Sequence, residues 1–155
     1  MASKKTLNAK NLEALGAERL AELLIEISTG DGAAKRRLRL ELAGAAGPAE
    51  VAREVRKRLA TVGRSRTFVD WQKRKALVDD LQNQRAAILE KVAPQDPGEA
   101  LDLMWRFLAI ADTVLERCDD SSSLVYEIFK FACEDLGEIA KAGKPDPATL
   151  ADRAF

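Results

Sequence analysis

The chain has 155 residues, the size of one ordinary domain, and 46% of them are hydrophobic, which is enough for a packed core. Charged residues make up 32%, with Lys plus Arg and Asp plus Glu equal at 25 each. Histidine is absent, and this excludes Ser-His-Asp and Cys-His nucleophiles, histidine-bound zinc or haem, and imidazole proton shuttles.

Apolar residues recur at spacings of three and four along almost the whole chain, and no segment alternates as a half-buried strand does. This pattern predicts an all-α fold. In the N-terminal half we expect four helices, over residues 9–15, 17–29, 32–45 and 48–62. Asn8 and Asp31 are the expected caps of the first and third, and Pro48 opens the fourth. The second has an apolar face that we expect to be buried, formed by Leu20, Leu23, Leu24 and Ile27.

Two long helices are expected in the middle of the chain. The first begins at Phe68 or Asp70, ends at Val92 and carries Trp71 on its buried side. The second covers residues 98–118 and is expected to be the most buried of all. The expected core joins the two through Leu81, Met104, Trp105, Phe107 and Leu108.

The C-terminal part completes the expected architecture. A helix begins at Leu124 and is expected to bend or end at Gly137, and Asp146 with Pro147 begins a last helix that reaches Phe155. Such paired helices predict an irregular multi-helix bundle or a short α-solenoid of antiparallel helix pairs. We expect residues 1–8 to be a mobile tail and residues 9–155 to form a single helical domain.

The balanced charge hides a division along the chain. Residues 1–95 contain 19 basic and 12 acidic residues, whereas residues 96–155 contain 6 and 13. The expected domain therefore has a basic half, residues 9–95, and an acidic half, residues 96–155. One interpretation is that the halves match each other, within or between molecules, and the other is that the basic half faces a polyanion.

The basic residues of the stretch 35–75 are the candidate binding residues. Residues 38–58 have the outline of a helix-turn-helix, and Arg53, Arg56 and Lys57 lie opposite the apolar stripe of their helix, toward solvent or a ligand. The candidate contacts to phosphate or another polyanion are Lys35, Arg36, Arg37, Arg39, Arg53, Arg56, Lys57, Arg64 and Arg66.

No other motif indicates chemistry. Cys118 and Cys133 have no metal-ligand spacing, and neither glycine-rich phosphate motif occurs. Adjacent carboxylates such as Asp79 and Asp80 diverge by about 100° on a helix, so they do not converge on one atom. We therefore expect no catalytic, cofactor-binding or metal-binding residue. No segment has the length and hydropathy of a signal peptide or a membrane span, which predicts a cytoplasmic protein without membrane contact.

Four segments in chain order resemble a family of uncharacterised bacterial proteins, a domain of unknown function: LNAKNLEALGAERLAELLIEIS (7–28), AAKRRLRLELAG (33–44), FVDWQKRKALVDDL (68–81) and ALDLMWRFLAIA (100–111). The resemblance implies an all-helical fold, no assigned activity or cofactor, and relatives longer than this chain, so that this chain corresponds to their N-terminal part. Some relatives carry a zinc-binding SWIM-type module, whose Cys and His ligands are missing here, and nothing of it transfers.

These observations favour a non-enzymatic helical interaction or scaffold module that binds protein. The alternative is a nucleic-acid-binding module that uses the basic stretch 35–75, and an enzyme comes third. The last helix has only Leu150, Ala151, Ala154 and Phe155 to bury. We therefore expect the C-terminal end to be frayed or to mediate self-association.

Overall fold

The structure is a computed structural model that describes residues 3–144 and 146–154. These residues form helices and no named strand, which confirms the all-α class. The chain divides into two compact units, Met1–Arg36 and Arg37–Phe155, which are called unit 1 and unit 2 below. The prediction of a tail over residues 1–8 and of one domain over residues 9–155 stays a prediction.

Unit 1 contains α1 (Ala9–Glu13), α2 (Ala17–Ser28) and the start of α3 (Gly32–Ala46). The predicted caps are confirmed. The Asn8 side chain accepts a hydrogen bond from the Asn11 N–H at 2.8 Å, and the Asp31 carboxylate accepts one from the Ala34 N–H at 3.1 Å. Each cap satisfies an amide at the start of a helix that has no partner inside the helix.

The expected burial of the α2 face is wrong for two of its residues. Leu24 is 49% exposed and Ile27 is 72% exposed, whereas Leu20 and Leu23 are half-buried. The only buried residue of α2 is Ser28. Helix α1 has just five residues and packs on only part of the apolar face of α2, so the rest of that face is not covered within unit 1.

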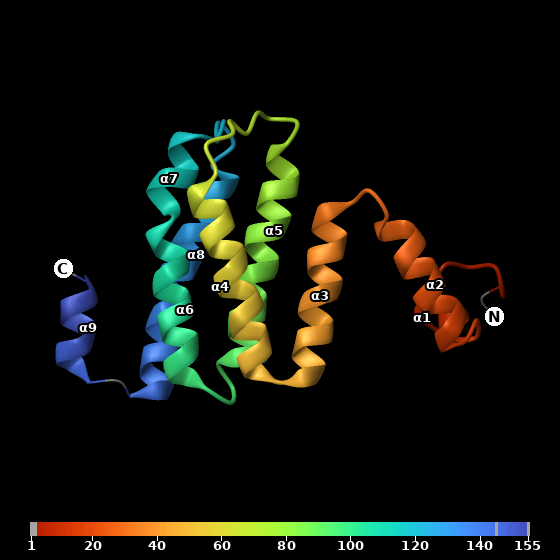
Figure 1. Cartoon of the computed structure of the whole chain (residues 1–155), viewed down its shortest axis with the longest axis horizontal. Coiled ribbons are helices and arrows are strands. Elements are labelled where there is room, and N and C mark those ends of the chain that lie inside the picture. The colour runs from red at the N-terminus through yellow and green to blue at the C-terminus, as the bar shows by residue number, and fades with distance from the viewer. Residues whose placement is uncertain (1–2, 145, 155) are drawn as a thin grey trace. The chain divides into compact units, whose positions relative to one another are not determined.

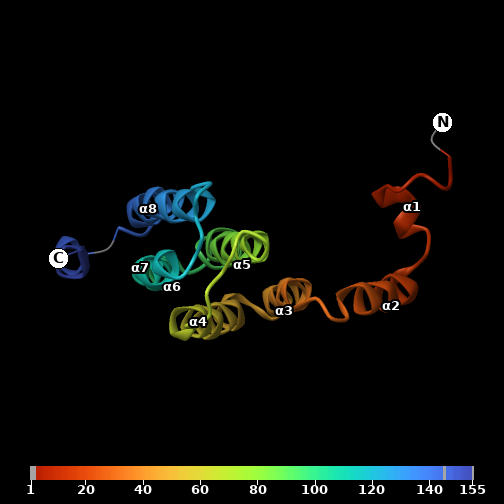
Figure 2. The same ribbon diagram turned by 90° about the horizontal axis from the view of Figure 1, so that it is seen from above.

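Unit 2 contains the remainder of α3 and the helices that follow it. They are α4 (Pro48–Arg64), α5 (Arg74–Ala87), a π-helical turn η1 (Ile88–Val92), α6 (Pro97–Ala109), α7 (Ala111–Glu116), α8 (Leu124–Gly143) and α9 (Pro147–Ala154). Figures 1 and 2 show α4, α5, α6 and α8 packed lengthwise against one another. Among the described helices, α6 makes its most extensive contact with α8, and η1 packs on α4, α5 and α6. Whether this arrangement is better described as an irregular bundle or as a short solenoid stays a prediction.

The core of unit 2 lies between α4, α5, α6 and α8. Leu81, Met104 and Phe107 are fully buried as expected, and the Phe107 and Phe129 rings pack with their centroids 5.3 Å apart. Trp105 and Leu108 are only half-buried, so the expected core is wrong for these two residues. They lie at the edge of the buried face of α6, where it turns toward solvent.

The expected long helix over residues 68–92 begins later, because α5 begins at Arg74. The preceding segment is held by a backbone bridge, in which the Val69 N–H donates to the Arg117 carbonyl at 2.8 Å and the Val69 carbonyl accepts from Asp119 at 2.8 Å. Trp71 therefore lies before the helix and is 65% exposed, which contradicts its expected burial. At the other end, the Ala93 N–H donates to the Ile88 carbonyl at 2.9 Å and closes the π turn.

The expected helix over residues 98–118 is broken at Ile110, where α6 ends and α7 begins. Gly63 of α4 lies against this junction, and a Cβ there would be 2.9 Å from Ile110 Cγ2. A side chain at residue 63 would therefore force Ile110 to shift. Farther along, α8 runs through Gly137 to Gly143, so the expected end at Gly137 is wrong.

The last helix begins where it was predicted to begin. The Asp146 carboxylate accepts a hydrogen bond from the Ala148 N–H at 3.3 Å, and Pro147 is the first residue of α9. Phe155 lies outside the described residues, and self-association through this end stays a prediction.

Candidate functional site

The predicted basic face of α4 is partly used inside unit 2. Arg56 forms an ion pair with Glu99 and donates to Asp102 at 3.3 Å. Burial alone would lower the pKa of Arg56, but the hydrogen bonds and charges of these two carboxylates outweigh it and raise the pKa. Arg53 pairs with Glu50 at 2.7 Å. Arg56 is partly exposed, with a side chain that is 37% accessible, and its charge is matched by α6; its role as a contact to a polyanion stays a prediction.

A further ion pair joins the basic and acidic halves of the sequence. Arg85 of α5 binds Asp135 of α8 with two nitrogens, one of them 3.2 Å from Asp135 Oδ1. Within the acidic half, Asp102 of α6 accepts from Arg106 at 2.8 Å and pairs with Arg153 of α9 at 2.8 Å. Burial alone would raise the pKa of Asp102, but the arginine hydrogen bonds lower it to about 2. Part of the charge division in the sequence is thus an internal match.

The neighbouring carboxylates of α5 have different surroundings. Asp80 is buried and lies 2.6 Å from Arg58, while a Gln84 amide nitrogen is 3.3 Å from it. Asp79 is exposed and pairs with Lys75 at 2.7 Å. The two carboxylates diverge, as helical geometry requires, and do not converge on a common reacting atom.

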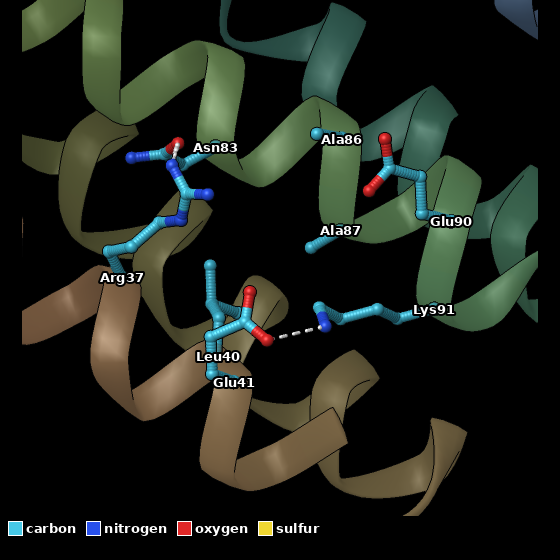
Figure 3. Close-up of a pocket in the computed structure, with 8 residues that line it drawn as sticks. All are labelled: Arg37, Leu40, Glu41, Asn83, Ala86, Ala87, Glu90 and Lys91. Atoms are coloured by element: carbon cyan, nitrogen blue, oxygen red, sulfur yellow. Dashed lines mark hydrogen bonds and ion pairs between the residues drawn. The ribbon is translucent and has the colours of Figure 1, made fainter. Parts of the chain in front are cut away.

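A small cleft lies between the unit 2 part of α3 and the helix formed by α5 and η1 (Figure 3). Its volume is about 140 Å³, and two polar links cross it: Arg37 donates to Asn83 at 3.3 Å, and Lys91 pairs with Glu41 at 3.0 Å. Sites for small organic ligands usually measure about 300–1,000 Å³. This cleft is well below that range, and Arg37, Glu41 and Lys91 of its lining already bind partners across it.

The segment between α4 and α5 carries the most unusual surface of unit 2. Two large rings are exposed there, Phe68 at 59% and Trp71 at 65%. Three cations accompany them, Arg64, Arg66 and Lys73, which are also exposed. None of the three forms an ion pair with any described residue. We call these five residues the loop surface.

The loop surface is supported by side chains from both sides of the Val69 bridge. The Arg117 guanidinium donates to the Thr67 carbonyl at 2.9 Å and to the Val62 carbonyl at 3.0 Å. Arg74 donates in the opposite direction, to the Asp119 carbonyl at 2.8 Å. These bonds hold the segment against the connection between α7 and α8, at one end of unit 2 (Figure 1).

The remaining candidate residues are spread over both units. In unit 1, Lys35 is exposed and Arg36 is half-buried; in unit 2, Arg39 and Lys57 are exposed. The sequence analysis identified Arg64 and Arg66 but missed Phe68, Trp71 and Lys73. The alternation of rings and cations in RSRTFVDWQK was the signal that could have indicated them.

The two cysteines differ in accessibility. Cys118 is buried and Cys133 is exposed, and neither is in a disulfide. Burial, and secondarily the charge of Asp120, raises the pKa of the Cys118 thiol. Within the part of the chain that the structure describes, no group of three or more potential ligands is placed to hold a metal ion, and no helix is long and apolar enough to cross a membrane.

The sequence model of a family of unknown function, DUF6880, matches residues 2–155. A search of curated proteins and a search of solved structures each found no match.

Proposed function

The chain belongs to the DUF6880 family, whose function is unknown, and we propose that it is a non-enzymatic interaction module that docks the apolar face of α2 into a groove of a partner protein. The observation that carries this proposal is the exposure of Leu24 and Ile27, which continue the stripe begun by Leu20 and Leu23. An amphipathic helix with its apolar stripe uncovered is the usual ligand of a hydrophobic groove.

The charges around this stripe indicate which kind of partner fits. The polar face of α2 carries Glu18, Glu22 and Glu26, and its one cation, Arg19, lies 2.9 Å from Glu22 and 3.7 Å from Glu26. Helices that bind membrane surfaces are rich in Lys and Arg instead, and so are those that bind nucleic acid. An acidic polar face therefore favours a protein groove over a membrane surface or a nucleic acid.

The exposed thiol of Cys133 supports a cytoplasmic location for this module, because a free surface thiol is usual where the environment is reducing. The alternative from the sequence is nucleic-acid binding through the basic stretch 35–75. Its helix-turn-helix form, over residues 38–58, is weakened by the ion pairs of Arg56 and Arg53. Direct base reading requires such arginines to be available.

The test places a photo-cross-linking amino acid in the full chain, expressed in cells of the source organism. At Ile27, on the stripe, we expect a covalent adduct of one discrete mass. At Glu18, on the opposite face, we expect none, and the Ile27 adduct should disappear when Leu24→Glu is added. The absence of a discrete adduct at Ile27 would contradict the proposal. An adduct of twice the mass of the chain would show that the partner is a second copy of this chain, not another protein.

A further inference from the structure

We infer that the loop surface, formed by Arg64, Arg66, Phe68, Trp71 and Lys73, binds single-stranded nucleic acid. The loop surface shares no residue with α2, and the inference does not rest on the function proposed above. It combines exposed rings with unpaired cations, the two features that bind single strands without sequence preference: bases stack on the rings and phosphates pair with the cations.

The fold holds the rings outside the core. Val69 is buried, and the bridge to the segment around Cys118 fixes its backbone, so its neighbour Phe68 in this extended segment points to the opposite side. Trp71 follows in a turn, in which the Asp70 carboxylate accepts from the N–H groups of Gln72 and Lys73 at 3.0 Å each. A fixed backbone keeps both rings exposed, and little further ordering is needed when a ligand binds.

The charges near the rings favour an anionic ligand. Residues 64–75 contain five basic residues and one acidic residue, Asp70. Two of the five have partners, since Arg74 binds the Asp119 carbonyl and Lys75 binds Asp79. The other three are the cations of the loop surface, and they leave the segment with uncompensated positive charge.

Acidic residues of the connection between α7 and α8 also lie at this end of unit 2, but backbone amides engage them. Asp120 accepts from the N–H groups of Val125 and Tyr126 at 2.9 Å each, at the start of α8. Asp119 accepts from the Ser121 N–H at 3.2 Å. These carboxylates serve as caps of their own turn, and none forms an ion pair with a cation of the loop surface.

The geometry favours a single strand over a duplex or a peptide. A stacked duplex does not offer base faces to Phe68 and Trp71, whereas an unpaired strand does. An extended peptide that adds to a sheet edge needs free backbone groups, and both backbone groups of Val69 are already used in the bridge. The exposed side chains of this segment include two rings and three cations.

The test titrates the full chain into a fluorescein-labelled thymidine homopolymer of about 15 nucleotides and follows both anisotropy and tryptophan fluorescence. We expect binding at low salt and quenching of Trp71, because an exposed indole stacks on a base. Three phosphate contacts predict a slope of about −2 in a plot of log affinity against log salt, which is roughly a 20-fold weakening between 50 and 200 mM. No binding at 50 mM salt would overturn the inference.

Variants then separate stacking from charge. Trp71→Ala should weaken binding about tenfold or more, and Arg64→Gln with Arg66→Gln should reduce the steepness of the salt slope. The matched controls are Tyr126→Ala, which removes another exposed ring, and Lys130→Gln, which removes a cation from α8; neither should alter binding. Circular dichroism verifies that each variant is folded.

Three outcomes would contradict the inference. The first is a Trp71→Ala variant that binds like the wild type, and the second is a duplex of the same length that binds as tightly as the single strand. The third is displacement of the strand by an equal concentration of polyglutamate, which would identify the surface as a site for an acidic protein segment.

Discussion

Replacing Phe107 by alanine should lower the free energy of unfolding of unit 2 by about 3–5 kcal/mol. Phe107 is 0% exposed, and its ring packs at 5.3 Å and a tilt of 47° on that of Phe129, where α6 makes its most extensive contact with α8. Removing the ring forfeits the burial of a large apolar side chain, about 1.5–3 kcal/mol, and an aromatic pair, about 0.5–1.5 kcal/mol. The cavity that remains adds the rest, because neighbouring helices relax only partly.

The assay is urea unfolding followed by tryptophan fluorescence. Trp71 and Trp105 both lie in unit 2, so the signal reports this unit and not unit 1. The matched control is Phe68→Ala, the same change at a side chain that is 59% exposed, and it should alter the unfolding free energy by no more than about 0.5 kcal/mol. A loss below about 1 kcal/mol for Phe107→Ala, or an equal loss for both variants, would refute the central placement of Phe107.

Two further predictions concern titratable groups. The pKa of Asp102 is 3.8 unperturbed and about 2 in the folded chain, so its ion pairs stabilise the fold above pH 3.8, and this stability is lost as the pH falls through about 2. Asp102→Asn should therefore lower the free energy of unfolding at pH 7. The pKa shift sets an upper limit of about 2.4 kcal/mol, and solvent screening of a side chain that is 26% exposed reduces the expected loss to about 1 kcal/mol. The urea midpoints of the two proteins should converge at low pH, and a difference that is the same at pH 7 and pH 3 would disprove the assignment. Separately, Cys133 should react with a thiol reagent in the native protein and Cys118 only after unfolding, because Cys118 is buried and its pKa is raised. Equal reaction rates of the two thiols would contradict this and show that the segment around Cys118 opens readily.

The features that could be predicted from the sequence are those that neighbouring residues decide. The caps Asn8, Asp31 and Asp146 act on amides two or three residues ahead, and all three are observed. The apolar stripe of α4 could also be predicted, since residue spacing alone places its members on one face of the helix. They are Val51, Val55, Leu59 and Val62, and all of them are buried. Local chemistry therefore gave the fold class and most helix starts.

The wrong predictions concern residues whose burial or pairing depends on segments distant in the sequence. Trp71 fits a helical stripe by phase, but the bridge between Val69 and Cys118 keeps the preceding residues extended and Trp71 lies in a turn before α5. Nothing near Trp71 in the sequence indicates the partner segment around Cys118. Ile27 lies on the expected apolar face, yet periodicity does not reveal whether the chain contains a surface to cover it. The candidate site shows the same limit, because basic residues can be counted from the sequence, whereas the pairing of Arg56 with α6 depends on the fold.

The π turn at Ile88–Val92 has a consequence for how chain length can vary among relatives. Its hydrogen bond spans five residues, from Ala93 to Ile88, where an α-helix spans four, so the turn accommodates one residue more than a regular helix does. A relative that lacks one residue here can continue as a regular α-helix and keep α5 and α6 in their places. The same deletion inside α5 would rotate every later side chain by about 100° and turn buried positions such as Ile88 toward solvent. Single-residue length differences between α5 and α6 are therefore expected to concentrate in this turn.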